Sequence, residues 1–210
     1  MNFLELCRRV REEVGYSGNG PASVIGQVGE MGRLVNKVNS AWLEIQQSRT
    51  NWRFMRKQIT ATVAAGSPTL TIADMKSVDK DSFAVVDGVT RSQLTHISRD
   101  AMRWRVTTPG RPTVYYSERG VISLWPTPAE ATVITGEYYT VPVLMASDNN
   151  AAPTMPEEYH EAIVWLAVRN LGAFEESGNT YTHASTEYQR IFNRMLKNET
   201  PDIIFGGSIA

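Results

Sequence analysis

The sequence predicts an α+β protein: a helical bundle formed by N- and C-terminal helices, with an inserted β-rich antiparallel region and an extended C-terminal tail. Near both ends of the chain, apolar residues recur every three or four positions, which is the spacing of helices that pack along one face. The middle of the chain contains short runs of β-branched and aromatic residues between Gly- and Pro-containing turns, which is typical of strands. We therefore expect a helical bundle domain over 1–58 and 146–200, a β-rich insertion over 59–145, and a tail over 201–210.

The N-terminal region predicts two helices. The first spans 2–14 and ends at Gly15, which opens a glycine-rich break. The second is expected at about 22–48, where apolar residues alternate by three and four positions, as in a helix that packs along its length against another helix. The predicted contact residues of this second helix are Val28, Met31, Val35, Val38, Trp42 and Ile45.

The region 59–145 predicts a series of short strands. The runs ITATV (59–63) and TLTI (69–72) alternate between apolar and polar residues, and the AAGSP between them is a Gly-containing loop, so we expect these two strands to form a hairpin. Asp-Gly, Pro-Gly and Pro-Thr-Pro turns interrupt the later runs. Further strands are expected at 83–88, 104–108, 113–117, 121–125 and 132–141.

The helical spacing returns in the last quarter of the chain. Thr154 and Glu157 have the spacing of a capping box, which predicts that a helix begins there. The segment 161–174 is apolar on almost all sides and predicts a buried central helix. A final helix follows and ends before Pro201, which cannot extend it. Its predicted apolar face consists of Ala184, Tyr188, Ile191 and Met195.

The overall charge argues against non-specific binding to nucleic acid or membranes. The chain of 210 residues has 21 Lys and Arg and 22 Asp and Glu, so it lacks an excess of cations. Residues 1–58 contain nine basic and five acidic residues, whereas 146–210 contain four and nine. Such unlike ends suit contacts between different faces of neighbouring copies. No apolar run approaches the roughly 20 residues that span a bilayer, so we expect a soluble protein without a membrane partner.

No catalytic or cofactor-binding motif is present in the sequence. The chain contains no G-x-x-x-x-G-K-[ST] phosphate loop and no G-x-S-x-G nucleophile elbow, and the glycine-rich stretch after Gly15 lacks the Rossmann spacing. Cys7 lies on a charged helix with no histidine nearby in sequence to activate its thiol. We therefore expect no enzyme activity, no catalytic residue and no cofactor.

The histidines do not form a metal-binding pattern. Glu157 and Glu161 lie within one helical turn of His160, a spacing that can hold a metal ion. The second histidine of an H-E-x-x-H helix is missing, because position 164 is Val164. We therefore expect no metal site and interpret His160 as part of the solvated first turn of a helix. The other two histidines, His96 and His183, lie far from it in sequence.

The stretch RTNWRFMRK, which we call the basic–aromatic segment (49–57), follows the second predicted helix. Basic residues that alternate with aromatic ones are typical of nucleic-acid contacts, and they also suit contacts between subunits. In the other interpretation, Trp52, Phe54 and Met55 fill the junction between bundle and insertion while the arginines face the acidic C-terminal helices. The candidate contact residues are Arg49, Trp52, Arg53, Arg56 and Lys57.

The C-terminal tail is unusually apolar for the end of a soluble chain. Exposed apolar ends of this kind generally dock, either onto their own bundle or onto a neighbouring protein, and both interpretations stay open here. The predicted docking residues are Ile203, Ile204, Phe205 and Ile209.

Three stretches together resemble a known family. They are NFLELCRRVREEVGYSGNGP (2–21), AWLEIQQSRTNWRFMR (41–56) and the segment from WPTPAEATVITGEYYTV to RNLGAFEE (125–176). In this order they resemble the head-to-tail adaptor (connector) proteins of tailed bacteriophages, especially the short-tailed (podovirus-like) type. The similarity extends over nearly the whole chain and is weakest at 74–112.

The resemblance implies a structural virion protein at the head–tail junction, made in the host cytoplasm. It implies a homo-oligomeric ring of about twelve subunits beneath the portal protein. Such a ring extends the DNA channel, lets double-stranded DNA pass through its lumen without sequence-specific binding, and gives the tail (nozzle or tube) protein its attachment surface. The alternatives are a DNA-binding packaging or regulatory factor that uses segment 49–57, and an enzyme whose site is scattered along the sequence.

Overall fold

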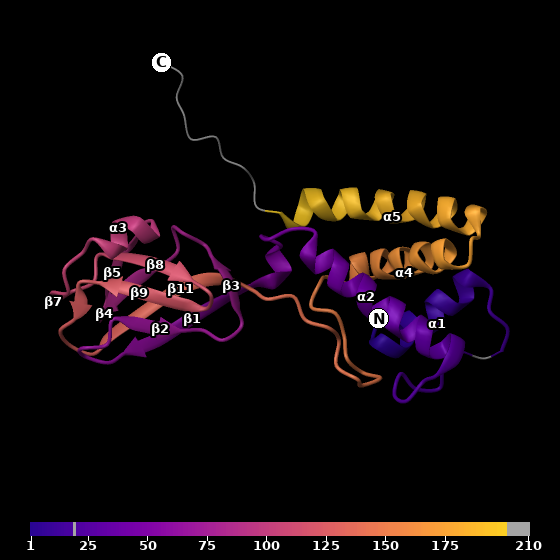
Figure 1. Ribbon diagram of the computed structural model, residues 1–210, viewed down its shortest axis with the longest axis horizontal. Coiled ribbons are helices and arrows are strands. Elements are labelled where there is room, and N and C mark those ends of the chain that lie inside the picture. The colour runs from indigo at the N-terminus through magenta and orange to yellow at the C-terminus, as the bar shows by residue number, and fades with distance from the viewer. Residues whose placement is uncertain (19, 201–210) are drawn as a thin grey trace, which may run out of the picture. The chain divides into compact units, whose positions relative to one another are not determined.

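The computed structural model describes residues 1–18 and 20–200, which fall into two compact units (Figure 1). The helical unit contains Met1–Met55 together with the chain from Pro142 onward, and the β unit contains Arg56–Val141. Each unit has its own hydrophobic core. Helices occur at both ends of the chain and a largely antiparallel β region lies between them, so the predicted α+β class is confirmed.

The first helix, α1 (Phe3–Val14), begins with a capping box, as its polar N-terminal sequence allows. The Asn2 side chain accepts a hydrogen bond from the Glu5 backbone N–H at 2.9 Å, and the Glu5 carboxylate accepts from the Asn2 N–H at 2.9 Å. Gly15 ends the helix at φ 78°, a left-handed conformation that glycine adopts without strain. The side chains that α1 buries are Phe3, Leu6, Cys7 and Val10.

The second helix, α2 (Gly29–Gln47), is shorter than predicted. The expected start near residue 22 is wrong, because Gly26 and Gly29 have φ values of 68° and 61° and the chain before Gly29 turns instead of forming a helix. Val28 is consequently 83% exposed and does not belong to the buried face of α2. The later contact residues are confirmed, since Val35, Val38, Trp42 and Ile45 are all buried.

The C-terminal helices follow a 3₁₀ turn, η2 (Glu157–Tyr159). They are α4 (His160–Phe174) and α5 (Gly178–Glu199), which lie side by side in Figure 1. The predicted central helix is confirmed, because α4 is buried at every position over 162–168 and packs against α1, α2 and α5. The predicted capping box does not form, since Pro156 is the N-cap of η2 and makes no side-chain cap. The predicted face of α5 is buried, with Ala184, Tyr188, Ile191 and Met195 in the core.

Two side-chain amides of α2 bind the extended segment by which the chain returns from the β unit. Gln46 Nε2 donates to the Val143 carbonyl at 2.8 Å, and the Val143 N–H donates to Gln46 Oε1 at 3.0 Å. Asn39 makes the same pair of bonds with Met145, at 3.2 and 2.8 Å. Each side-chain amide thus pairs with the N–H and the C=O of one residue, as a neighbouring strand would, and the buried Gln46, which is only 2% exposed, is satisfied.

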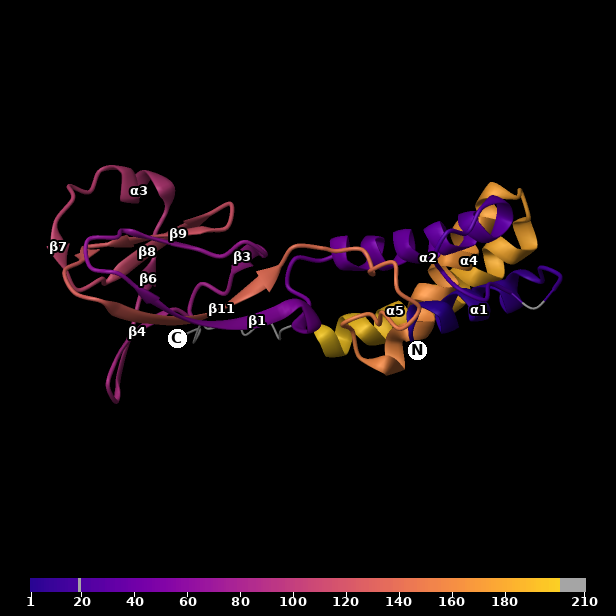
Figure 2. The same cartoon turned by 90° about the horizontal axis from the view of Figure 1, so that it is seen from below.

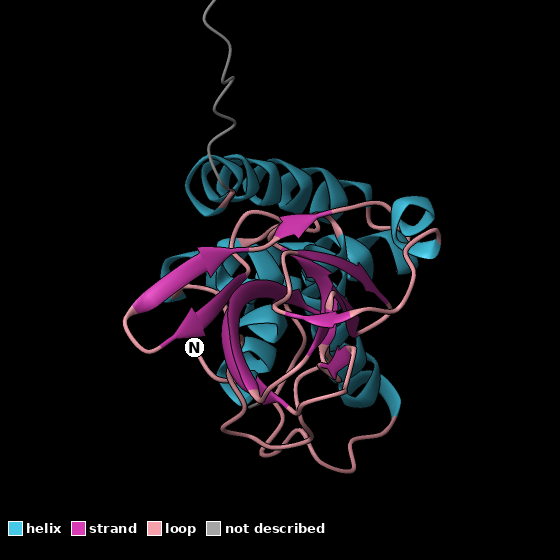
Figure 3. Cartoon of the chain, turned by 90° about the vertical axis from the view of Figure 1, so that its left-hand side faces the viewer, coloured by secondary structure: helices cyan, strands magenta, loops and turns pink. Residues whose placement is uncertain are grey.

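The β unit consists of two larger sheets and one two-stranded pairing (Figure 3). One sheet has the order β1-β11-β4-β5, with β3 also paired to β11, and the other has the order β2-β9-β8-β6. The pairings are antiparallel except β6 with β8 and β7 with β10. The strands are β1 (Arg56–Val63), β2 (Thr69–Thr71), β3 (Met75–Val78), β4 (Ala84–Asp87), β5 (Thr90–Gln93), β6 (Thr95–His96), β7 (Pro109–Gly110), β8 (Val114–Glu118), β9 (Val121–Trp125), β10 (Thr127–Pro128) and β11 (Thr132–Thr140).

The predicted hairpin of 59–63 with 69–72 is wrong, although both segments are strands. β1 pairs along its whole length with β11, and the two strands run side by side in Figure 2. β2 pairs with β9 in the other sheet. The turn after β1 is held by the Gly66 N–H, which donates to the Pro128 carbonyl at 2.8 Å and not to the strand that follows. Arg56 and Lys57, assigned to the bundle from sequence, begin β1 in the β unit.

The strand predicted at 104–108 is also wrong. A short helix, α3 (Arg99–Arg103), starts at Ser98, whose hydroxyl accepts from the Ala101 N–H at 3.2 Å. It ends at Trp104, and the residues after it are not paired as a strand. The strand predicted at 121–125 is confirmed as β9 with the same ends, and the other predicted strands occur with shifted ends.

We expect Gln46→Ala to lower the free energy of unfolding of the helical unit by about 1–3 kcal/mol, because the part-buried N–H and C=O of Val143 both lose their hydrogen bond to Gln46. Urea denaturation followed by helical circular dichroism measures this loss. The control is Gln47→Ala at the neighbouring exposed position, which is expected to change stability by less than about 0.5 kcal/mol. Equal effects of the two substitutions would show that the amide pairing does not stabilise the unit.

Candidate functional site

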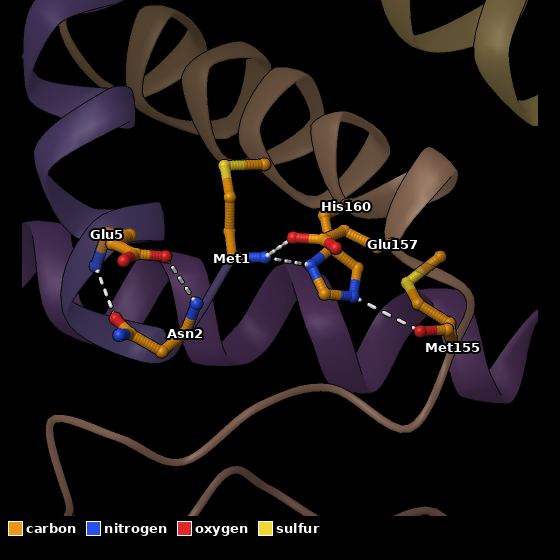
Figure 4. A network of polar contacts seen from close by, with 6 residues as sticks. All are labelled: Met1, Asn2, Glu5, Met155, Glu157 and His160. Atoms are coloured by element: carbon orange, nitrogen blue, oxygen red, sulfur yellow. Dashed lines mark hydrogen bonds and ion pairs between the residues drawn. The ribbon is translucent and has the colours of Figure 1, made fainter.

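Polar contacts join the N-terminal residue to the start of α4 (Figure 4). The Met1 ammonium group donates to Glu157 Oε1 at 2.8 Å and lies 2.8 Å from His160 Nδ1. On the other side of the ring, His160 Nε2 lies 3.1 Å from the Met155 carbonyl oxygen. These neighbours suit a neutral imidazole whose Nδ1 accepts from the ammonium and whose Nε2–H donates to the carbonyl.

His160 is 4% exposed, so the interpretation of this histidine as part of a solvated helix turn is wrong. Desolvation by burial lowers the pKa of His160, and the nearby ammonium acts in the same direction. The ammonium also lowers the pKa of Glu157, because it donates a hydrogen bond to the carboxylate. Glu161 instead pairs with Arg9 of α1 at 3.3 Å. The cluster therefore joins α1 to α4, and within residues 1–18 and 20–200 no three His, Cys, Asp or Glu side chains gather as metal ligands.

The remaining residues considered for chemistry make packing contacts. Cys7 is fully buried, and burial raises the pKa of its thiol to about 12, so the reactive thiolate is not formed near neutral pH. The His96 ring packs edge-on against Tyr115 at a centroid distance of 5.1 Å in the β unit. The His183 ring packs edge-on against Trp165 at 5.3 Å in the helical unit.

The aromatic part of the basic–aromatic segment belongs to the core of the helical unit. Trp52 is fully buried, and its indole N–H donates to the Ile45 carbonyl at 2.9 Å. Its ring stacks on Phe54 at 5.4 Å and meets Phe192 edge-on at 6.0 Å. Met55, in the following 3₁₀ turn η1 (Arg53–Met55), is 3% exposed. Trp52 therefore cannot stack on a nucleic-acid base while this core is intact.

The basic residues of the segment are divided between the two units. In the helical unit Arg49 is exposed, and Arg53 Nη1 donates to the Asn198 carbonyl at 2.8 Å near the end of α5. Burial raises the pKa of the neighbouring Glu199, and the charge of Arg53 opposes that shift. Of the arginines in the segment, Arg53 thus contacts the acidic C-terminal helix α5.

In the β unit, the two remaining basic residues form ion pairs. Arg56 lies 3.0 Å from Glu137, and Lys57 Nζ lies 2.8 Å from Asp74 Oδ2. The hydrogen bond between Lys57 and Asp74 raises the pKa of the lysine and lowers that of the carboxyl group. Of the five predicted contact residues, Arg49, Trp52 and Arg53 thus belong to the helical unit and Arg56 and Lys57 to the β unit, and their role in a contact stays a prediction. The predicted docking residues Ile203, Ile204, Phe205 and Ile209 lie outside the described residues.

A second basic and aromatic stretch, which we call the arginine–tryptophan loop (103–106), is exposed on the β unit. Trp104 is 82% exposed and Val106 is 80% exposed. The loop is nevertheless fixed to the sheet, because the Trp125 indole N–H donates to the Val106 carbonyl at 2.9 Å and the Arg105 guanidinium lies 4.2 Å from the Trp125 ring centroid. The signal for this surface in the sequence is the stretch RWRV, in which basic and apolar residues alternate and which therefore also predicts a strand.

The connection between α4 and α5 forms a second exposed surface, which we call the acidic–aromatic turn (174–181). Phe174 is 55% exposed and Tyr181 is 45% exposed. Glu175 and Glu176 lie between them and are exposed as well. In the sequence, the signal for this surface is the pair of adjacent carboxylates, Glu175 and Glu176, that follows Phe174.

Comparison with known families gives one result that covers both units. The model of a family described as SU10 adaptor protein matches residues 1–204. No curated protein matches the chain. Within the part of the chain that the structure describes, no helix combines the length and the hydropathy required to cross a membrane.

We expect the protein to lose stability as the pH falls below about 6.5, the ordinary pKa of histidine, because the folded state holds His160 neutral while the unfolded state binds a proton. The contribution is complete above that pH and decreases as the pH falls towards the lower pKa of the folded state. Melting temperatures between pH 7.5 and 5.5 measure it. His160→Gln should remove part of the pH dependence and cost about 1–3 kcal/mol at pH 7.5.

The matched control for this prediction is His183→Gln, which replaces an exposed histidine on α5. This variant should keep the pH dependence of the unchanged protein. An unchanged pH dependence in His160→Gln would contradict the account of a buried neutral imidazole.

Proposed function

The chain belongs to the SU10 adaptor protein family, and from this premise we propose that it is the head–tail adaptor of a short-tailed (podovirus-like) bacteriophage. As a phage adaptor it is a structural protein of the virion head–tail junction. In our proposal about twelve copies form a ring beneath the portal protein. The ring extends the DNA channel and presents the attachment surface for the tail (nozzle or tube) protein, without catalysis and without a cofactor.

The observation that carries this proposal is the family match over residues 1–204, which includes both units. An adaptor must bind two different partners and must stay folded when these partners exert force on it. A chain with two separately packed cores can carry one binding surface on each. The backbone joins the two units twice, at Met55 to Arg56 and at Val141 to Pro142. A mechanical force between the units is therefore carried by two backbone connections.

The charge distribution supports passage of DNA in preference to tight DNA binding. Dense Lys and Arg contacts to phosphates would hold DNA in a salt-dependent way. In this chain the formal charge is −1. Moreover, Arg56 and Lys57 are already paired with carboxylates of their own unit.

The alternative function is a DNA-binding packaging or regulatory factor that uses segment 49–57. Because Trp52 is buried, the segment lacks the main aromatic ring on which a nucleic-acid base could stack. The carboxylates that already pair with Arg56 and Lys57 would compete with DNA phosphates for these cations. A gel-shift titration at increasing salt discriminates the two functions. Tight binding that weakens steeply with salt would favour the alternative.

We expect the protein to be monomeric or weakly associated alone and to form a closed ring when mixed with its portal protein. Polar subunit contacts of modest area favour assembly on a template, because the template removes part of the entropic cost of association. Electron microscopy of the protein with and without portal rings tests this. Portal rings that carry no added density would contradict the adaptor proposal, and rings formed without the portal would contradict only the template requirement.

We further propose that residues 201–210 form a docking arm for the portal or for a neighbouring subunit. Each of Ile203, Ile204 and Phe205 would contribute about 1.5–3 kcal/mol if its side chain were buried. Truncation after Thr200 is therefore expected to abolish portal attachment, while helical circular dichroism and the melting temperature stay nearly unchanged. Co-sedimentation with portal rings measures the attachment.

The control for the truncation is a full-length chain with Asp202→Ala and Ser208→Ala, which keeps the apolar residues of the tail and should still attach. Unfolding of the truncated chain would show that the tail belongs to its own core. A truncated chain that stays folded and still attaches would show that the arm is dispensable.

A further inference from the structure

We propose that neighbouring copies of this chain contact each other through two unlike surfaces, the arginine–tryptophan loop (103–106) of one copy and the acidic–aromatic turn (174–181) of the next. This inference rests on the proposed ring, since it names the surfaces that join its subunits. The two surfaces lie on different units of the chain. Because each copy uses its loop towards one neighbour and its turn towards the other, the proposed contact is heterologous, the type that closes into a ring when the rotation between copies allows it.

The arginine–tryptophan loop has the composition of an interface centre. Tryptophan and arginine are the residue types that most often dominate binding at protein interfaces. Here Trp104 and Val106 leave most of their apolar surface in water, at 82% and 80% exposure. Arg103 lies beside the Trp104 ring at 5.9 Å and has no carboxylate partner among the described residues.

The loop is also held in place before any partner binds. Trp125 fixes it twice, through the hydrogen bond to Val106 and through the stacked guanidinium of Arg105. Ser98 caps the helix that precedes it. A surface already fixed in this way loses little conformational entropy on association, which favours binding.

The acidic–aromatic turn offers the complementary chemistry. Phe174 provides exposed aromatic surface at 55%, although the Arg33 guanidinium lies 4.3 Å from its ring centroid. The Glu175 carboxylate accepts a hydrogen bond from the Tyr16 hydroxyl. Glu176 has no hydrogen-bond or ion-pair partner within residues 1–18 and 20–200, and its φ of 55° places it in an exposed left-handed turn.

Charge complementarity indicates that the partner of each surface is a second copy of this chain. Arg103 and Arg105 on the loop would meet Glu175 and Glu176 on the turn, and aromatic surface lies next to the charges on both sides. Opposite charges that meet across an interface steer association and fix its register. A pair of complementary surfaces on every copy links each copy to two neighbours, as a ring requires.

The test exchanges the charges across the proposed contact. Arg103→Glu and Glu176→Arg are each expected to lower ring formation on portal particles at least tenfold at a fixed protein concentration, because the substituted residue then faces a like charge at every contact. An equimolar mixture of the two variants should recover to within about threefold of the unchanged protein, since alternating copies restore opposite charges at each contact. The chain with both substitutions should recover equally. Electron microscopy counts the ring-bearing portals.

Three controls make the result specific to this contact. Lys76→Glu reverses an exposed charge elsewhere on the β unit and should leave ring formation unchanged. Circular dichroism should show that all variants are folded. Trp104→Ala, which leaves charges untouched, should lower ring formation as the charge variants do.

The outcomes separate this inference from the proposed function. Variants that form rings as well as the unchanged protein would overturn the contact and leave the adaptor role intact. Single variants that fail and are not rescued by mixing would also overturn it, because the loop or the turn would then bind the portal or tail protein. An unchanged protein that forms no ring on portals would overturn the proposed function and this inference with it.

Discussion

Burial of α4 is the constraint on which the rest of the structure depends. This helix is apolar on nearly all sides, so it is stable in water only when other helices surround it. Those helices come from both ends of the chain, since α1 and α2 precede the β unit and α5 follows it. The β unit is therefore an insertion, and the chain must return to the helical unit at a defined place. Asn39 and Gln46 of α2 define that place by pairing with the returning backbone.

The sequence predicted the helices well because their signals are local. Apolar spacing and end signals such as Gly15 lie within the helix or next to it, so α1, α4 and the buried face of α5 could be predicted. The start of α2 was missed because the helix was extended before the apolar spacing that begins at Val28, and the backbone conformations of Gly26 and Gly29 are not helical. The hairpin was wrong for a different reason. A loop shows that the chain can turn, but the partner of β1 is a strand near the end of the insertion.

Exposure of candidate contact residues could not be predicted from composition. The two stretches RTNWRFMRK and RWRV have the same interleaving of basic and aromatic residues, yet Trp52 is fully buried and Trp104 is 82% exposed. Trp52 follows α2 closely in the chain and packs into the core of the helical unit. Trp104 instead follows the short helix α3, and Trp125 fixes the loop that contains it to the sheet. His160 shows the same limit, since only the fold brings the N-terminal ammonium to its ring.

An adaptor built in this way has two cores, one of which depends on both ends of the chain. Native-state hydrogen exchange followed by mass spectrometry tests this claim most directly. The account predicts that amides in the middle of α1, α2, α4 and α5 share one opening free energy, distinct from that of β1 and β11. An opening that exposes α1 and α2 while α4 and α5 stay protected would contradict it.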